Sequence, residues 1–449
     1  MDITSFDVDS EKQRQTTFRS SRLWTWMRTG FAILIPSFIN QPKPTTIHPT
    51  TYLDGFRGLF SFLVFVRHYL LPWEAGLDTG YRQRDQEAYA RSFVKLPIIR
   101  LLYSGPTVAI FFVVSGFVLS CKPLRLIRDG SHEKIFHHFA SSIFRRALRL
   151  FIPPMITTLF VAFAVHFRLY RSPYEDMPGT TPRHPKVLGS MVFQLSDWTR
   201  FVFEDLTHPW TWKSPRSEYD SHLWTIPIQF RASMIVFLTL LGLAKTRVIV
   251  RSAILLALWV YSLQQGRWDV ALFFAGILLS EINLESRNWS SLRARLFSKV
   301  VFVSGLYIGS FPRLHGAGRA TPGFVWMATL NQQPRFWQSL AATLLVGAMS
   351  KDALLQGIFN WSPLRYLGKI SFSLYLVHGP LLHLFGYWFV SAFLGWTGKS
   401  STSQYQSGVL LALVFLTPIV LWVADVFWQL VDRPCGNWVR RVESWCFRE

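Results

Sequence analysis

The sequence predicts an all-α polytopic membrane protein with about ten transmembrane helices in a bundle. Half of its 449 residues are hydrophobic and only 16% are charged. The apolar residues form repeated blocks separated by short charged loops, which is typical of a chain that crosses a bilayer many times. The predicted spans, in order, are Phe56–Trp73, Leu101–Cys121, Ala147–Arg168, His222–Ala244, Val248–Gln265, Trp268–Leu284, Val300–Phe311, Gln338–Leu355, Ile370–Leu394 and Gly408–Val431.

Loop charges predict that both termini face the cytosol. With this orientation the cytosolic loops are mostly basic, whereas acidic and basic residues balance in Arg171–Ser221 on the opposite side. The N-terminal region carries no signal-peptide pattern, so the first span would serve as the membrane address. Leu23–Ile39 is interrupted by Arg28 and Pro36, which favours a helix in the membrane interface. The basic loops are Lys122–Arg146, Lys245–Arg247, Glu285–Lys299, Lys351–Lys369 and Asp432–Glu449.

We find no internal repeat, so the chain is expected to form one membrane domain over residues 51–431. Residues 1–50 would be a cytosolic segment and residues 432–449 a cytosolic tail, in the endoplasmic reticulum or another endomembrane. The longest connection between predicted spans is Arg171–Ser221. A lid over a lumenal mouth and a surface loop without chemistry are equally good interpretations of it.

The formal net charge of +21 does not indicate a nucleic-acid-binding protein. The basic residues are spread among loops rather than gathered in one soluble domain with a binding motif. The expected partner is therefore the lipid bilayer. No disulfide is expected, because the cysteines fall at cytosolic ends, and no metal site is expected, because they lack metal-ligand spacing. These cysteines are Cys121, Cys435 and Cys446.

Two ionisable residues on the first span are candidates for catalysis. Arg57 and His68 are separated by about 16 Å of helix and lie on nearly the same face. An imidazole near its ordinary pKa of about 6.5 can take a proton from a hydroxyl, so His68 is a candidate general base, although a structural histidine is the alternative. Arg57 is equally well explained as an interfacial anchor. Arg67 is better explained as a snorkelling or paired charge.

The ninth span supplies a further candidate, His378, which precedes a Gly379-Pro380 kink. A histidine beside a break in a membrane helix is explained equally well by membership of a functional site and by a structural role. Arg145, Arg146 and Arg149 share one helix face before the third span. They could bind the phosphates of a nucleotide-type cofactor, although positive-inside charge or anionic lipid binding explains them better.

Three other polar residues could contact a substrate. Ser115, beside Gly116 on the second span, is better explained by close helix packing. Arg231 lies well inside the fourth span and needs a partner. Gln229 can accept a hydrogen bond from it but cannot supply a negative charge. His222, at the start of this span, is expected to be interfacial.

These motifs, in this order, resemble the integral-membrane acyltransferase-3 family, and more closely its fungal branch. Each motif is weak alone, but the ordered set is specific and covers the chain from Tyr52 to about Val431. The motifs are Tyr52–Gly58 followed by His68, Phe111–Phe117, Leu223–Pro227 followed by Phe230-Arg231, and Ser371–His378.

The resemblance implies a membrane enzyme that transfers an acyl group, often acetyl from acetyl-CoA, to an acceptor hydroxyl, often that of a secondary metabolite. Arg57 and His68 match the family's arginine–histidine pair. The resemblance also supports phosphate binding before the third span. Gln229 replaces the glutamate that relatives usually carry, so a catalytically inactive scaffold remains one alternative. The other is a transporter whose buried arginines and histidines line a path.

Overall fold

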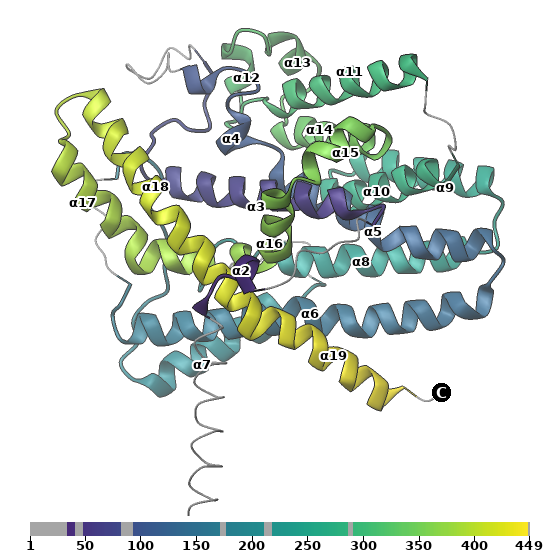
Figure 1. Ribbon diagram of the computed structural model, residues 1–449, viewed down its shortest axis with the longest axis horizontal. Helices are drawn as coiled ribbons and strands as arrows, with labels where there is room; N and C mark the ends of the chain where they lie inside the picture. The colour runs from purple at the N-terminus through teal and green to yellow at the C-terminus, as the bar shows by residue number, and fades with distance from the viewer. Residues whose placement is uncertain are drawn as a thin grey trace, which may run out of the picture.

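The computed structural model describes residues 34–40, 48–81, 93–170, 177–210, 218–285 and 291–447, and the elements assigned over these residues are all helical (Figure 1). The chain therefore forms an all-α bundle, as the sequence predicts. Its longer helices are α3 (Thr51–Leu70), α5 (Thr107–Arg128), α6 (His132–His166), α7 (Met191–Phe201), α8 (Thr225–Gly242), α9 (Val248–Gln264), α10 (Trp268–Glu285), α11 (Leu292–Gly309), α14 (Pro334–Lys351), α16 (Ser362–Leu381), α17 (Tyr387–Thr397), α18 (Thr402–Phe427) and α19 (Arg433–Cys446).

Shorter elements connect or extend these helices, and three of them are π-helical turns that continue a neighbouring helix. The π-helical turns are η3 (Val202–Leu206), η4 (Leu382–Gly386) and η5 (Trp428–Asp432). The other short elements are α2 (Ser37–Asn40), η2 (Phe93–Lys95), α4 (Leu101–Ser104), α12 (Ala317–Ala320), α13 (Val325–Leu330) and α15 (Ala353–Phe359).

Five helical segments in the described part of the chain are long and apolar enough to cross a membrane. The ten predicted spans all overlap helices, but some cover more than one, and the number ten stays a prediction. Leu101–Cys121 covers both α4 and α5, and Gln338–Leu355 runs from α14 into α15. The first predicted span, α3, is not among these five because it carries three charged residues, Asp54, Arg57 and Arg67. The five segments are Thr107–Arg128, His132–His166, Thr225–Gly242, Ser362–Thr397 and Thr402–Cys446.

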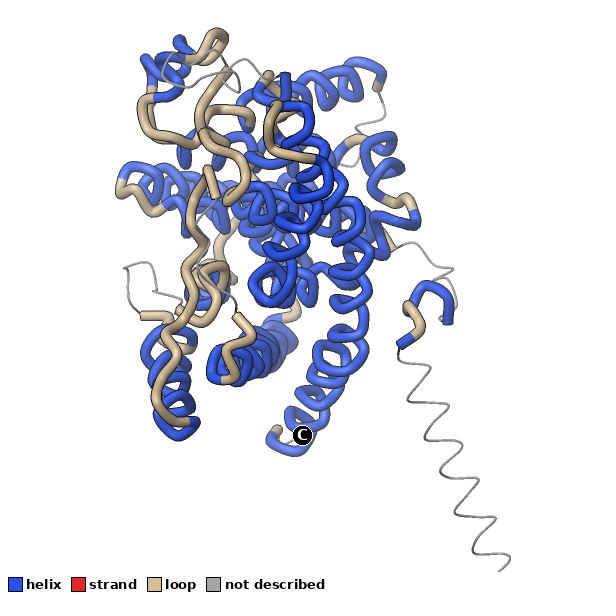
Figure 2. The backbone as a smooth tube through the Cα atoms, turned by 90° about the vertical axis from the view of Figure 1, so that its left-hand side faces the viewer, coloured by secondary structure: helices blue, strands red, loops and turns tan. Residues whose placement is uncertain are grey.

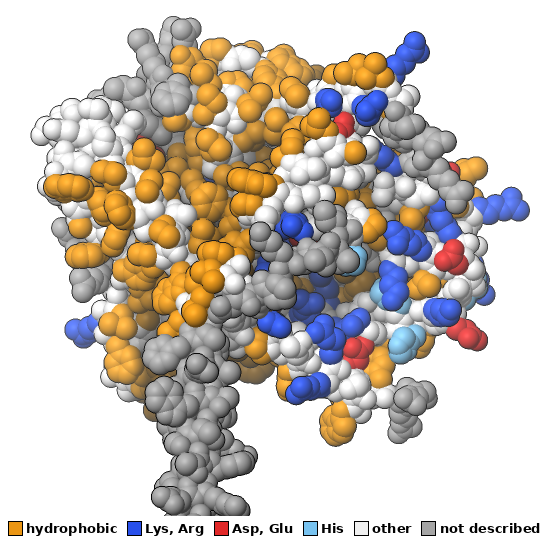
Figure 3. Space-filling view, in the orientation of Figure 1, with side chains coloured by type: hydrophobic (Ala, Val, Ile, Leu, Met, Phe, Trp, Pro, Cys, Tyr) orange, Lys and Arg blue, Asp and Glu red, His pale blue; other side chains and the backbone are white. Residues whose placement is uncertain are grey.

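The two ends of the bundle differ in charge and in loop structure. Lys and Arg side chains gather on the right of the space-filling view, at the end where α5 gives way to α6 (Figure 3). Long loops gather at the opposite end, which faces the viewer in Figure 2. This asymmetry agrees with the basic loops that the sequence assigns to the cytosol.

Two predicted segments differ from the structure. The expected span Val300–Phe311 is the second half of a longer helix, Leu292–Gly309, whose first turns are polar. The long connection Arg171–Ser221 contains α7 and η3 in its described part, so it is not a plain loop. Its role as a lid stays a prediction. Most of the predicted interfacial segment Leu23–Ile39 lies outside the described residues.

Close packing between α3 and α16 sets the geometry of the functional site. A Cβ atom on Gly58 would lie 2.3 Å from the backbone nitrogen of Gly368, and one on Gly368 would lie 2.2 Å from the carbonyl oxygen of Asp54. The absence of a side chain at Gly58 allows this approach. The two helices run in the same direction, because Arg57 contacts Ser371 and His68 contacts His378. Backbone contact at the glycines therefore brings the two histidines together.

Replacing Gly58 by Leu is expected to force α3 and α16 apart and to lower the free energy of unfolding by about 1–3 kcal/mol or more. The thermal midpoint of the detergent-solubilised protein should fall. Gly395→Leu in α17 is the matched control, because nothing lies within 4 Å of its added Cβ. Equal behaviour of the two variants would show that the glycine contact does not position the site.

Candidate active site

Three histidines from three parts of the chain meet at one end of the bundle. His68 lies in the last turn of α3, His378 lies near the end of α16, and His222 lies just before α8. One nitrogen of each ring lies within 4.8 Å of those of the other two. The sequence predicts His68 and His378 as catalytic candidates, and the structure places them in direct contact. It also adds His222, which was expected to be interfacial, to the same cluster.

A chain of hydrogen bonds assigns the tautomer of His68. His378 Nδ1 lies 3.0 Å from the carbonyl oxygen of Leu374, which can only accept, so Nδ1 carries the hydrogen. His378 is fully buried, which favours its neutral form with a lone pair on Nε2. This Nε2 lies 3.0 Å from His68 Nδ1, which must therefore donate. The remaining nitrogen of a neutral His68, Nε2, keeps its lone pair and can accept a proton.

Asp220 orients the third histidine. Its Oδ1 lies 2.7 Å from His222 Nδ1 and accepts a hydrogen bond from the His222 backbone at 2.9 Å. Burial raises the pKa of Asp220, but the charge and hydrogen bonds of His222 outweigh this effect and hold that pKa below its ordinary value. Asp220 is therefore ionised and can stabilise positive charge on His222. The rings of His222 and His68 lie close, with their centroids 3.8 Å apart.

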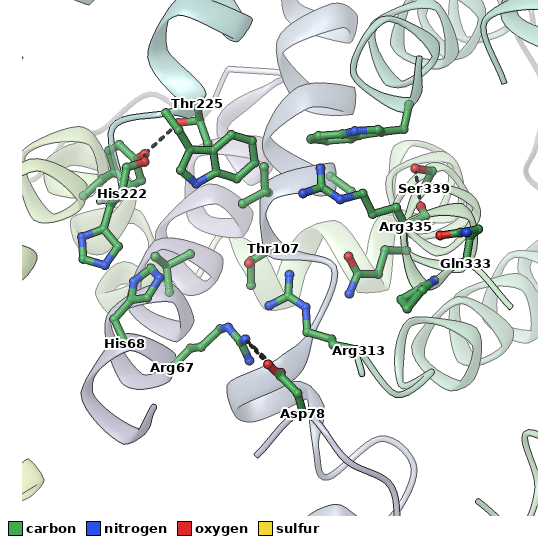
Figure 4. Close-up of a pocket in the computed structure, with 18 of the residues that line it drawn as sticks. Arg67, His68, Asp78, Thr107, His222, Thr225, Arg313, Gln333, Arg335 and Ser339 are labelled. Atoms are coloured by element: carbon green, nitrogen blue, oxygen red, sulfur yellow. Dashed lines mark hydrogen bonds and ion pairs between the residues drawn. The ribbon is translucent and has the colours of Figure 1, made fainter. Parts of the chain in front are cut away.

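A cavity of about 470 Å³ opens beside the histidines (Figure 4). His68 and His222 line one side of it, and arginine and tryptophan side chains line much of the remainder. Arg67 donates to Asp78 at 2.9 Å, which confirms that this arginine is paired. The cavity is large enough for a small organic molecule and presents the cluster to it. The complete polar lining is Arg67, His68, Asp78, Thr107, His222, Thr225, Arg313, His315, Gln333, Arg335, Gln338, Ser339 and Tyr375, with Trp224 and Trp268.

A second cluster of charged residues lies toward the opposite end of α3. Arg57 interacts electrostatically with Arg146 and Arg149 of α6, and Asp432 of η5 is within range of Arg57 and Arg149. Arg146 donates from Nε to Ser233 at 2.8 Å, while its buried Nη2 has no hydrogen-bond partner among the described residues. These arginines present donors suited to phosphate oxygens. Arg57 thus lies with the predicted phosphate-binding residues, about 16 Å along the helix from His68.

The three histidines could also hold a divalent metal ion. Asp220 and the Leu374 carbonyl contact the outer nitrogens of two of them, as in many zinc sites. Against this, His68 lies within electrostatic range of Arg67 and Arg313, whose positive charges oppose a cation.

Comparison with known proteins agrees with these observations. The acyltransferase-3 family, described as an acyltransferase domain, matches residues 50–429. The chain belongs to this family. It is 35% identical to the O-acetyltransferase PaAT-1 of Phomopsis amygdali over 89% of this chain and 86% of that protein. It is 28% identical to the acyltransferase clz18 of Cochliobolus lunatus, over 89% and 97% of the two chains. No solved structure matches it.

The remaining predicted residues of this acyltransferase lie away from the histidines. Arg145 pairs with Glu443 of α19 at 3.3 Å and is less free to bind phosphate than Arg146. Gln229 donates to Ser115 at 3.0 Å, so the two predicted substrate contacts bind each other between α8 and α5. Gly116 packs against Phe273 of α10, as the packing interpretation predicts.

Arg231 of this acyltransferase has a carboxylate partner, Asp269, at 2.9 Å. It also donates to the carbonyl of Pro209, and Arg267 contacts the same carboxylate at 2.9 Å. The charge of Arg231 is therefore compensated from α10 and does not depend on a glutamate at position 229. We conclude that Gln229 does not leave the buried arginine without a counter-charge.

Sequence reasoning did not find His222 and Asp220 as members of the cluster. The available signal was their spacing, two positions apart just before an apolar helix. It becomes informative only when α8 begins beside the ends of α3 and α16.

Proposed function

We propose that this acyltransferase moves an acyl group, most simply acetyl, from an acyl-CoA to a hydroxyl of a small lipophilic acceptor. The observation that carries the proposal is the hydrogen-bond chain that leaves His68 Nε2 unprotonated beside the cavity. The acceptor would occupy the cavity, and the acceptor class that we favour is a hydroxylated secondary metabolite.

The proposed reaction uses His68 as base and then as acid. Its Nε2 takes the hydroxyl proton while the acceptor oxygen attacks the thioester carbonyl carbon. The tetrahedral intermediate collapses as the C–S bond breaks, and the same proton goes to the departing CoA thiolate. His378 would hold the tautomer, and His222 with Asp220 would stabilise nearby charge.

The donor would bind along α3. Its phosphates would contact Arg57, Arg146 and Arg149, and its extended pantetheine arm would bring the thioester toward His68. With both termini on the cytosolic side of an endomembrane, the donor would enter from the cytosol. The acceptor would reach the histidines from the cavity at the other end of the bundle.

The test is incubation of membranes carrying the wild-type protein with labelled acetyl-CoA and a panel of lipophilic alcohols. We expect label to appear in an ester product only when both the protein and a suitable alcohol are present. Uptake of an alcohol into sealed vesicles without esterification would instead support the transporter alternative.

Replacing Arg146 by Gln is expected to raise the KM for acetyl-CoA about tenfold or more, because charge-assisted hydrogen bonds to phosphate are lost. The acceptor KM should change little. Arg440→Gln, an exposed arginine of α19, is the control. An unchanged KM for acetyl-CoA in the Arg146 variant would mean that the phosphates bind elsewhere.

Chelators are expected to leave the activity unchanged, because the positive charges near His68 oppose a bound cation. The measurement is the transfer rate after treatment of the purified protein with 1,10-phenanthroline or EDTA. Loss of activity that added zinc restores would contradict this expectation and make the three histidines metal ligands.

A further inference from the structure

Much of the cavity is cationic. Arg67, Arg313 and Arg335 line it, with Asp78 as the acidic residue in the described lining, and Asp78 already pairs with Arg67. Neither Arg313 nor Arg335 has a carboxylate within ion-pair distance among the described residues. Their guanidinium groups point toward the same space (Figure 4). Asp78 lies within electrostatic range of Arg313, and Asp269 lies within range of Arg335. Both carboxylates already pair with other arginines, so the cavity keeps an excess of positive charge.

A buried arginine behind the cavity strengthens this field. Arg100 is fully buried, and all three of its guanidinium nitrogens are without a hydrogen-bond partner among the described residues. It lies within electrostatic range of Arg313. Uncompensated charge in a region of low dielectric attracts a counter-ion more strongly than the same charge on an exposed surface.

Arg335 is held in a geometry that suits a planar anion. Its guanidinium carbon lies 4.4 Å from the ring centroid of Trp268 and 5.7 Å from that of Trp224. Contact with the ring face leaves the N–H groups, which lie in the guanidinium plane, available for hydrogen bonds. The tryptophans also provide an aromatic surface for the apolar body of a ligand.

We propose that Arg313 and Arg335 form an anion subsite that binds a carboxylate of the acceptor, so that this enzyme acts on a hydroxylated lipophilic acid. The proposal rests on the proposed function, because it places the acceptor in the cavity beside His68. The carboxylate at the arginines and the apolar body against the tryptophans would direct one hydroxyl toward the histidines.

The position of the subsite favours the acceptor over the donor as the source of the anion. The phosphates of acyl-CoA have a separate set of arginines, Arg57, Arg146 and Arg149, at the other end of α3. Donor and acceptor anions held at opposite ends would bring the thioester and the hydroxyl together from two sides.

The test uses 1-naphthoate and its neutral analogue 1-naphthamide as probes of the purified protein, with binding measured by calorimetric titration. Wild-type protein should bind naphthoate at least about tenfold more tightly than naphthamide. Arg313→Gln and Arg335→Gln should each remove most of this preference, whereas Arg313→Lys should keep part of it. Arg319→Gln, an arginine of α12 outside the cavity, is the matched control, and thermal midpoints confirm folding.

A second arm separates the two sources of the anion. Adenosine 3′,5′-bisphosphate carries phosphates of CoA without the pantetheine arm, and we expect it to leave naphthoate binding unchanged. Displacement of naphthoate by the bisphosphate, or equal binding of naphthoate and naphthamide by the wild type, would overturn the proposal. Because binding needs no turnover, a protein that binds naphthoate through these arginines but transfers no acyl group would reject the proposed function alone.

Discussion

Replacing His68 by Gln is expected to lower kcat for acyl transfer by about 10³-fold, within the 10²–10⁴ range that a positioned general base contributes. The hydrogen-bond chain from Leu374 through His378 leaves Nε2 of His68 as the accepting atom. Glutamine has a side chain of similar volume to histidine, but its amide is not a comparable base. The KM for acetyl-CoA should change little, because the arginines proposed to bind its phosphates are unaltered.

The control for this variant is His383→Gln. His383 follows α16 in η4 and stacks on Tyr170, with ring centroids 5.0 Å apart, rather than joining the cluster. It should retain transfer activity at a similar thermal midpoint. A His68 variant that folds and turns over at the wild-type rate would remove His68 as the base and leave His222 as the nearest alternative.

Replacing His378 by Ala is expected to lower kcat by about 10²–10³-fold without a comparable change in the KM for acetyl-CoA. The physical reason is loss of the acceptor that holds His68 in its active tautomer, a loss that is costly in other base–orienter pairs. His378 is thus a positioning residue in this mechanism, and its effect on rate acts through His68.

His378→Gln distinguishes this role from simple packing. The amide oxygen of glutamine can accept a hydrogen bond from His68 Nδ1, so this variant should retain more activity than the alanine variant. Equal losses in the two variants, accompanied by equal falls in thermal midpoint, would indicate that His378 only fills space in the bundle.

The sequence predicts the helical bundle well because bilayer-spanning helices need long apolar runs. It misplaces the start of α11, because Arg293, Arg295 and Lys299 on its first turns hide the helix from an apolar pattern. A sequence signal for the close approach of α3 is Gly58, because a glycine on an apolar helix allows backbone contact.

The candidate site was predictable only in part. Arg57, His68 and His378 stand out because ionisable groups in apolar helices are costly. Their partners do not stand out, because pairing depends on which helices are neighbours. Asp269 lies 38 residues from Arg231, and Asp220 precedes the fourth span in a polar segment. The offset of α3 against α16, which joins His68 to His378, is likewise a property of packing.

The structure shows that the arginine cluster and the histidine cluster lie at different ends of α3, which no single sequence motif shows. The sequence places Arg57 and His68 about 16 Å apart along one helix but does not show which residues join each of them. In the structure Arg57 lies with Arg146 and Arg149, whereas His68 lies with His378 and His222. In the proposed reaction the two residues would therefore act at different places, Arg57 at the donor phosphates and His68 at the bond that forms.

The most direct test of the central claim is acceptor-dependent release of CoA thiol from acetyl-CoA by the purified protein, measured for the wild type and for His68→Gln. We predict that the wild type releases one CoA for each ester formed and that the variant loses this release while remaining folded. Acceptor-dependent release at the same rate in both proteins, or esterification by neither, would contradict histidine-based acyl transfer at this site.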